Sequence, residues 1–232
     1  MKYYFIEHSL DPKIIGRQFP QSQEAVWPLI INDPDLVFNH PLSFHKYLFV
    51  KAPPNVVVPD FVMRNSAKIT DYINAASANF PIISRKMVDI IDQHKSSNFQ
   101  WLPTHLLWKE TKIGDYFMLN PLYVDYEILD LEKSEFEKIE DCSLIYPPKS
   151  VFLPKNYEEL SFYDSAIFKS TSKERIEVKS CVINKEAQGD LYYLKNFYVL
   201  DLTRYTSGLI ISEKVKQELE AAKCTGFDLI EL

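Results

Sequence analysis

One short unit is written twice in this sequence, and it constrains the fold more than any other feature. The segment 82–99 aligns without a gap on the segment 210–227. The residues identical in the two segments are Ile82, Ile83, Ser84, Lys86, Lys95 and Phe99, which match Ile210, Ile211, Ser212, Lys214, Lys223 and Phe227. We therefore expect a fold that uses the same local structure at two places.

The unit reads as a capped helix that leads into a strand. Ser84 and Ser212 each stand where a helix N-cap belongs, because a serine hydroxyl accepts from the free N–H groups of the first turn. Apolar residues follow both serines at helical spacing; they are Met87, Val88 and Ile91 in the first copy, and Val215, Leu219 and Ala222 in the second. Gly226 suits the left-handed position after a helix. The pattern predicts two amphipathic helices, at about 84–95 and 212–223.

The rest of the chain favours strands. Residues 2–8 and 191–202 are rich in aromatic and β-branched side chains. Roughly 115 mostly strand-like residues separate the two helices, which is unlike an alternating βαβ pattern. We predict an α+β fold with a mostly antiparallel sheet or sheets and the two Ser-capped helices on one face. The repeat is either a true duplication or the similarity expected of two Ser-capped amphipathic helices that each lead into a strand. The residues leave both interpretations open.

The N-terminal segment differs from the rest. Eight prolines interrupt residues 11–60, so no long helix is expected there, and residues 42–50 read equally as a strand or a short helix. We predict an irregular, Pro-rich segment at 1–60 that begins with a strand, and an α+β core at 61–232. The 232 residues are enough to bury a substantial core, and the two parts are expected to form one compact domain.

Charge and composition exclude several classes of partner. The net charge is −6, and binding to nucleic acid or to an anionic membrane requires a basic face. Cys142, Cys181 and Cys224 are odd in number and widely spaced, so neither a disulfide framework nor a zinc site is expected. The N-terminus has no apolar signal region, and no apolar run reaches the ~18 residues of a membrane span. A cytoplasmic, soluble protein is predicted, and its oligomeric state is left open.

No motif indicates catalysis or a cofactor. The five histidines are His8, His40, His45, His94 and His105, and none forms HExxH or HxH. There is no GxSxG elbow for a serine nucleophile, and the five scattered glycines form no phosphate-binding loop. Ser84 and Ser212 read as helix caps. We therefore predict no catalytic, cofactor-binding or metal-ligating residue.

The net charge of the segment 125–141 equals that of the whole protein. The segment's sequence DYEILDLEKSEFEKIED holds eight acidic residues and two lysines, a net charge of −6 that leaves the rest of the chain neutral. It is either a solvated face or a docking surface for a basic partner. The residues predicted to bind that partner are Asp125, Glu127, Asp130, Glu132, Glu135 and Glu137. The apolar anchors there would be Tyr126, Leu129, Leu131 and Phe136; if Leu129, Phe136 and Ile139 face the interior, they are core.

The C-terminal region 191–232 resembles the C-terminus of an immunity-protein superfamily of bacterial polymorphic toxin systems. That family tends to end with a pattern written iFvSe-lkeal-aaglTGl-F, which is read here as Leu209-Ile210-Ile211-Ser212-Glu213, then Val215, Leu219 and Ala222, then Thr225-Gly226-Phe227. An earlier family segment is similar to 80–103 followed by 115–130. Asp125, Asp130 and Ser134 loosely match the family's DaLD motif and following serine. The likeness covers roughly 61–136 and 174–232.

The resemblance implies a function without catalysis. A member of this superfamily binds and blocks a toxin domain made by its own cell or a sister cell, and it needs no catalytic residue. We therefore expect a cytoplasmic immunity protein whose partner is a cognate toxin. Two alternatives remain: an interaction module without a toxin partner, and an enzyme of unrecognised type that uses dispersed acids and histidines.

Overall fold

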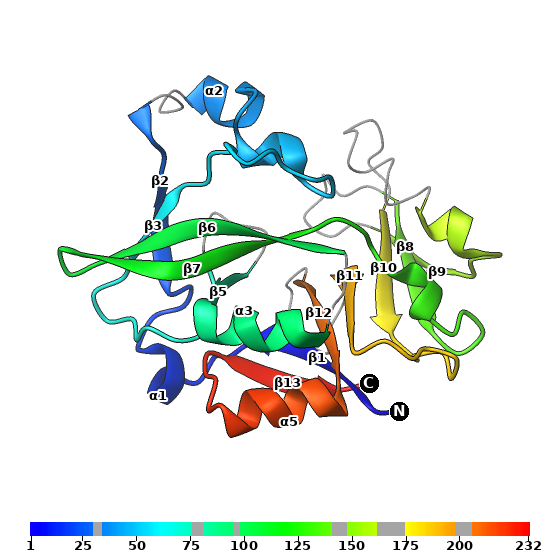
Figure 1. Cartoon of the computed structure of the whole chain (residues 1–232). Helices are drawn as coiled ribbons and strands as arrows, with labels where there is room; N and C mark the ends of the chain where they lie inside the picture. The colour runs from blue at the N-terminus through cyan, green and yellow to red at the C-terminus, as the bar shows by residue number, and fades with distance from the viewer. Residues whose placement is uncertain (30–33, 76–80, 95–97, 141–147, 162–174, 198–205) are drawn as a thin grey trace.

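Strands from both ends of the chain share a sheet, as the computed structural model shows (Figure 1). The structure describes residues 1–232 except 30–33, 76–80, 95–97, 141–147, 162–174 and 198–205. Its helices are α1 (Pro12–Ile15), α2 (Pro34–Asn39), α3 (Arg85–Ile91) and α5 (Glu213–Ala221), with the 3-10 turns η2 (Phe44–Tyr47), η3 (Asp92–His94) and η4 (Tyr126–Ile128). The helices α3 and α5 occupy the two places where the repeated unit predicts them.

The described strands form two sheets. The first has the order β13-β1-β12-β11-β10-β8-β9. Its strands are β1 (Tyr3–His8), β8 (Glu135–Ile139), β9 (Lys149–Phe152), β10 (Arg175–Ser180), β11 (Leu191–Phe197), β12 (Thr206–Ser212) and β13 (Phe227–Glu231). The second has the order β2-β3-β6-β7-β5-β4. Its strands are β2 (Ser22–Val26), β3 (Asp60–Met63), β4 (Tyr72–Ile73), β5 (Ile82–Ser84), β6 (Phe99–Trp108) and β7 (Thr111–Pro121).

Most of the strand pairs are antiparallel, and the parallel ones are β3 with β6 and β10 with β11. The predicted α+β class with mostly antiparallel sheets is confirmed. Residues 42–50, for which the sequence left strand and helix open, contain the 3-10 turn η2. The segment 1–60 supplies strands to both sheets: β1 pairs with β12 and β13, while β2 pairs with β3.

The main core lies where α3 and α5 cover the two sheets. The two helices lie side by side (Figure 1). The apolar stripe of α3 is buried there through Met87, Val88 and Ile91, and that of α5 through Val215 and Leu219. Burying a side chain of this size contributes about 1.5–3 kcal/mol, so these stripes fix each helix on its sheet.

Candidate functional site

Four polar side chains meet between the end of α3 and the start of α5. The Ser212 hydroxyl donates to Asp190 Oδ1 at 2.6 Å. The His94 ring lies between two carboxylates, with Nδ1 3.1 Å from Asp190 Oδ2 and Nε2 2.6 Å from Glu218 Oε2. The hydrogen bond from Ser212 and the nearby His94 hold the pKa of Asp190 below its usual value. Serine, histidine and acidic side chains also make up the active sites of many hydrolases. The geometry of this cluster therefore decides whether it can be a catalytic site.

The geometry is that of a structural cluster. A serine nucleophile needs a base that accepts its proton, whereas the Ser212 hydroxyl donates to a carboxylate and accepts from the Val215 N–H at 3.4 Å. Both ring nitrogens of His94 lie within hydrogen-bond distance of carboxylate oxygens, so neither faces the Ser212 hydroxyl. The His94 side chain is only 3% exposed. The cluster therefore fastens the start of α5 to the end of α3.

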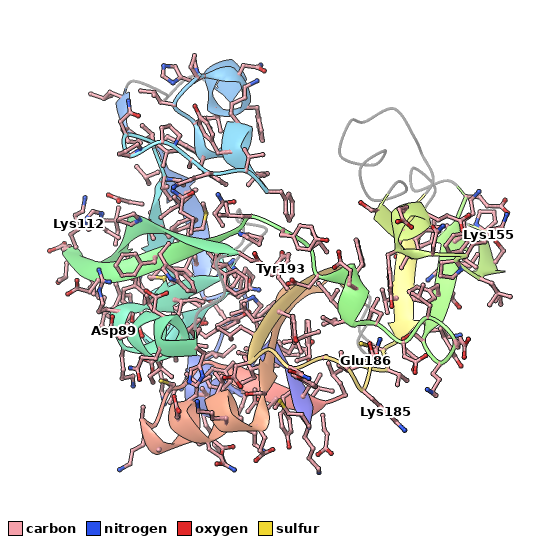
Figure 2. The ribbon with its side chains drawn as sticks, turned by 45° about the vertical axis from the view of Figure 1, so that its right-hand side comes forward. Asp89, Lys112, Lys155, Lys185, Glu186 and Tyr193 are labelled. Atoms are coloured by element: carbon pink, nitrogen blue, oxygen red, sulfur yellow. The ribbon has the colours of Figure 1, made fainter. Side chains whose placement is uncertain are left out.

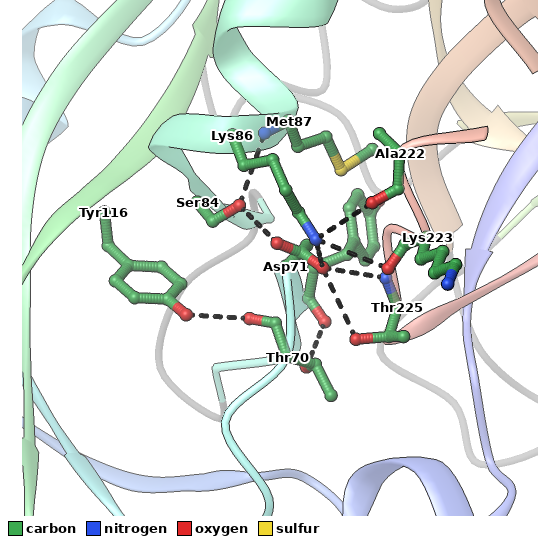
Figure 3. A network of polar contacts seen from close by, with 10 residues as sticks. Thr70, Asp71, Ser84, Lys86, Met87, Tyr116, Ala222, Lys223 and Thr225 are labelled. Atoms are coloured by element: carbon green, nitrogen blue, oxygen red, sulfur yellow. Dashed lines mark hydrogen bonds and ion pairs between the residues drawn. The ribbon is translucent and has the colours of Figure 1, made fainter. Parts of the chain in front are cut away.

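A second cluster surrounds Asp71 and fastens the opposite ends of the same helices (Figure 3). Asp71 Oδ1 accepts from the Ser84 hydroxyl at 2.7 Å, and Oδ2 accepts from the Thr225 N–H at 2.9 Å. The Lys86 ammonium lies 2.9 Å from Asp71 Oδ2 and donates to the Lys223 carbonyl at 3.3 Å, just beyond the end of α5. A cation at a helix C-terminus is stabilising. Asp71 thus joins the start of α3 to the end of α5.

The strands around the two serines pair in the same register. Ser84 of β5 lies opposite Tyr116 of β7, and Ser212 of β12 lies opposite Tyr3 of β1, both in antiparallel pairs. The match continues along both strands: Ile82 pairs with Met118, and Ile210 pairs with Phe5. β7 and β1 therefore hold equivalent places, although one lies in the middle of the chain and the other begins it.

The two tyrosines also make equivalent hydrogen bonds. The Tyr116 hydroxyl donates to the carbonyl of Thr70 at 3.0 Å, and the Tyr3 hydroxyl lies 3.1 Å from the carbonyl of Gly189 and 2.9 Å from that of Ala187. Thr70 and Gly189 each directly precede one of the two aspartates, Asp71 or Asp190. After each helix, the next strand begins with a phenylalanine, Phe99 in β6 or Phe227 in β13.

Sequence reasoning missed the two aspartates. Asp71 precedes its serine by 13 residues and Asp190 precedes its serine by 22. An ungapped comparison cannot align them, because β4 and β5 are shorter than β11 and β12. The signal that could have found them is local: in each copy, an aspartate stands directly before the strand that pairs with the Ile-Ile-Ser strand.

The six acidic residues predicted to bind a partner do not form one open surface. Asp125 is buried, and its Oδ2 accepts from the Tyr193 N–H at 2.6 Å. Asp130 forms an ion pair with Lys133. Glu137 is flanked by Lys149 at 3.6 Å and Lys179 at 3.0 Å. The remaining three, Glu127, Glu132 and Glu135, are exposed, and Glu127 accepts from the Tyr123 hydroxyl.

Asp125 has a further property that follows from its burial. Removal from water raises the pKa of its carboxyl to about 6, and the hydrogen bonds from Tyr193 and from the Asn98 amide oppose that rise. Figure 2 shows Tyr193 near the centre of the molecule. Asp125 therefore ties the chain that follows β7 to strand β11 of the other sheet.

The apolar residues of the acidic segment are mostly core. Leu129, Phe136 and Ile139 are each at most 2% exposed, and Tyr126 is 7% exposed, so the interior alternative holds for them; Leu131 is half-buried. The exposed apolar side chains lie instead on the neighbouring strand, at Val151 (80% exposed) and just beyond its end at Leu153 (79% exposed).

No group of three or more potential metal ligands occurs in the part of the chain that the structure describes. His105 pairs with Asp60 at 2.9 Å, and His40 accepts from the Leu42 N–H at 3.1 Å. His8 lies against the Tyr72 ring, and His45 lies against the Phe44 ring.

The cysteines give no sign of activation. Burial raises the pKa of Cys181 to about 12 and is the main cause that raises that of Cys224 to about 11. Both thiols are free, and a thiol with a raised pKa is a poor nucleophile near neutral pH. Cys142 lies outside the described residues.

No model of a known protein family matches the chain, and none of the curated proteins matches it. Within the described residues, every helix is too short or too polar to pass through a membrane.

Proposed function

We propose that this chain is a non-catalytic immunity protein that binds a cognate bacterial toxin and neutralises it by occupying its surface. The proposal starts from the resemblance of 191–232 to the C-terminus of the immunity superfamily. The observation that carries it is the surface formed by β8 and β9, where apolar and acidic side chains are exposed together. We also expect the protein to act in the cytoplasm.

The β8–β9 surface, which we define by the exposed residues Glu135, Val151 and Leu153 and the partly buried, ion-paired Glu137, follows from strand register. Glu137 lies directly opposite Val151 in the antiparallel pair, and Phe136 lies opposite Phe152. The same register brings Leu153 across from Glu135, and alternation places all four residues on one face. Exposed aliphatic side chains supply affinity once a partner buries them, and acids beside them favour a basic partner.

We further infer that the two units are copies of one ancestral unit and serve as scaffold. The shared strand registers, the paired aspartates and the tyrosine hydrogen bonds support this inference. The polar side chains of the repeated unit are engaged in fastening α3 and α5 to each other. The β8–β9 surface belongs to neither copy, so it is an addition to the scaffold where a specific function can reside.

Co-expression with a toxin tests the proposal. The toxin domain encoded by the neighbouring upstream gene is expressed with and without this chain, and growth and complex formation are measured. We expect restored growth and a stoichiometric complex in a pull-down. Absence of both results would end the proposal.

A second reading, an interaction module without a toxin partner, uses the same β8–β9 surface. It predicts no protection in the growth assay, together with binding of some other basic protein at Val151 and Leu153. The growth assay therefore separates the two readings.

A further inference from the structure

Strand β9 ends the larger sheet and is itself poorly covered. In the described residues it pairs with β8 on one side and is the last strand in the sheet order. Lys149, Ser150 and Val151 are all exposed, and Phe152 is half-buried against the second core cluster. A strand in this position presents backbone N–H and C=O groups to which another strand can bind.

The sequence around β9 limits that edge to a short window. Pro148 precedes the strand and Pro154 follows Leu153. A proline cannot donate to a β-ladder, and prolines or very short strands are common devices that prevent uncontrolled pairing at an edge. The window from 149 to 153 remains, and within it Val151 and Leu153 point to the same face. A partner strand of matching length can therefore pair with this edge, whereas the two prolines prevent the pairing from extending into open-ended aggregation.

The charges near the window 149–153 determine which kind of partner strand can bind. The residues that flank the window in the sequence, or lie on or close to the paired strand, include four exposed acids and the exposed Lys155. The acids form no ion pair in the described part of the chain: Glu132, Glu135, Glu140 and Glu158. Lys149 is already engaged with Glu177 at 3.2 Å. A second copy of this chain would bring the same acids against these, at a net charge of −6 for each copy. A basic strand from a different protein gains attraction where a second copy meets repulsion.

We propose that the toxin binds by adding a short β-strand to the free edge of β9, with basic side chains toward the surrounding acids and apolar side chains against Val151 and Leu153. This inference rests on the proposed function and specifies how the partner is held. Main-chain hydrogen bonds within 149–153 supply the part of the affinity that does not depend on the partner's side chains, and the alternating side chains supply specificity.

Hydrogen exchange on the complex tests the inference. The probe is the toxin domain encoded by the neighbouring upstream gene, and backbone amide exchange is measured for the free chain and for the complex. We expect the amides of Val151 and Leu153, which alternation places on the side away from β8, to exchange at least about tenfold more slowly in the complex, since each new ladder bond protects an N–H. The double variant V151K/L153K should bind at least about tenfold more weakly, because two lysines repel a basic strand and block the edge.

The matched control is Leu29→Lys, which places a lysine at a 91% exposed leucine far from β9 in the sequence. It should bind as the wild type does, and circular dichroism checks that all variants remain folded. A complex that leaves 149–153 unprotected, or one that V151K/L153K forms equally well, overturns strand addition and leaves the proposed function standing. Lack of any complex, together with lack of protection in the growth assay, overturns both. A dimer of this chain that protects 149–153 without toxin overturns the inference in favour of self-association.

Discussion

At the scale of single residues, two aspartates organise the scaffold. Asp71 and Asp190 each accept a hydrogen bond from the hydroxyl of a capping serine and also bind the far end of the other helix. A carboxylate that accepts several hydrogen bonds keeps its charge at low energetic cost, because the bonds replace its hydration. Each helix start is therefore stabilised by a residue that also fixes how the two helices pack.

Replacing Asp190 with asparagine tests this role. Asp190→Asn removes one of the two carboxylates that face the buried His94 ring, and it weakens the acceptor for Ser212. We expect the free energy of unfolding to fall by about 2 kcal/mol, the range for a charged hydrogen bond lost inside a network. Urea denaturation measures the change.

The control for Asp190→Asn is Asp89→Asn on the same helical layer. Asp89 is 61% exposed, and its pair with Arg85 is long, at 3.9 Å. A surface pair of this kind contributes at most about 1 kcal/mol, so little change is expected. Equal stability of the two variants would show that the Asp190 cluster does not hold the helices together.

The buried carboxyl of Asp125 makes the stability of the protein depend on pH. Its pKa of about 6 lies above the ordinary value of 3.8, so the folded state binds its proton more tightly than the unfolded state does. Stability therefore rises as the pH falls from above 6 toward 4, by about 1.4 kcal/mol for each pH unit between the two pKa values. Above about pH 6 the contribution is constant and unfavourable.

The variant Asp125→Asn should lose this contribution. The stability of the wild type relative to Asp125→Asn is expected to increase by about 2–3 kcal/mol between about pH 7 and about pH 4. Urea denaturation of both proteins across that range gives the difference, in which titration of all other groups cancels. A difference that does not change with pH would show that Asp125 keeps an ordinary pKa.

At the scale of elements, sequence patterns located the two helices but not the surfaces. The apolar stripes of α3 and α5 were visible because 3.6-residue periodicity is local. The net negative charge of 125–141 was also evident from the sequence, but the ion pairs that neutralise part of it were not. Lys149 and Lys179, which flank Glu137, arrive from two other strands, β9 and β10. Burial of Asp125 depends likewise on β11, which begins at Leu191.

Reversing the exposed acids tests which part of that charge acts on a partner. The double variant E132K/E135K changes two exposed residues near β9 and leaves the paired Glu137 in place. We expect its association with the toxin domain to slow by about tenfold at low salt, and the dependence of the rate on salt to become weaker. Stopped-flow mixing at two ionic strengths measures both quantities.

The control for the charge reversal is E24K/E110K, which alters the net charge equally at two exposed positions on β2 and on the turn after β6. If both double variants slow association to the same extent, net charge alone steers the partner. If neither does so, the acids near β9 have no part in recognition.

At the scale of the whole molecule, strand β1 takes beside β12 the place that β7 takes beside β5. In the first copy the chain runs in the order β4, β5, α3, β6 and β7; in the second it runs β11, β12, α5 and β13, and β1 occupies the place of β7. A sequence comparison shows only the middle of this arrangement, because β1 and β13 lie far apart in the sequence. The strands added beside the copies, β2 with β3 and β8 to β10, have no counterpart in the other copy.

This topology predicts that the chain tolerates a circular permutation. The end of β13 lies beside the start of β1, where Glu231 pairs with Tyr4 and the Leu232 N–H donates to the Tyr3 carbonyl at 3.0 Å. A short Gly-rich turn can therefore join Leu232 to Met1, with new termini between the exposed residues Leu10 and Asp11. The permuted chain then carries both copies in the same strand order, and we expect it to unfold cooperatively with a stability within about 2 kcal/mol of the parent.

A second permutant provides the contrast, joined by the same turn but opened between Leu102 and Pro103, inside the long β6–β7 pairing. Its new ends interrupt a ladder of the core sheet, so a loss of several kcal/mol is expected. Urea denaturation and hydrogen exchange compare the two chains. If the chain opened at Leu10–Asp11 is as unstable as the one opened in β6, then β1 cannot follow β13 in the chain as β7 follows β6, and the expected tolerance is wrong.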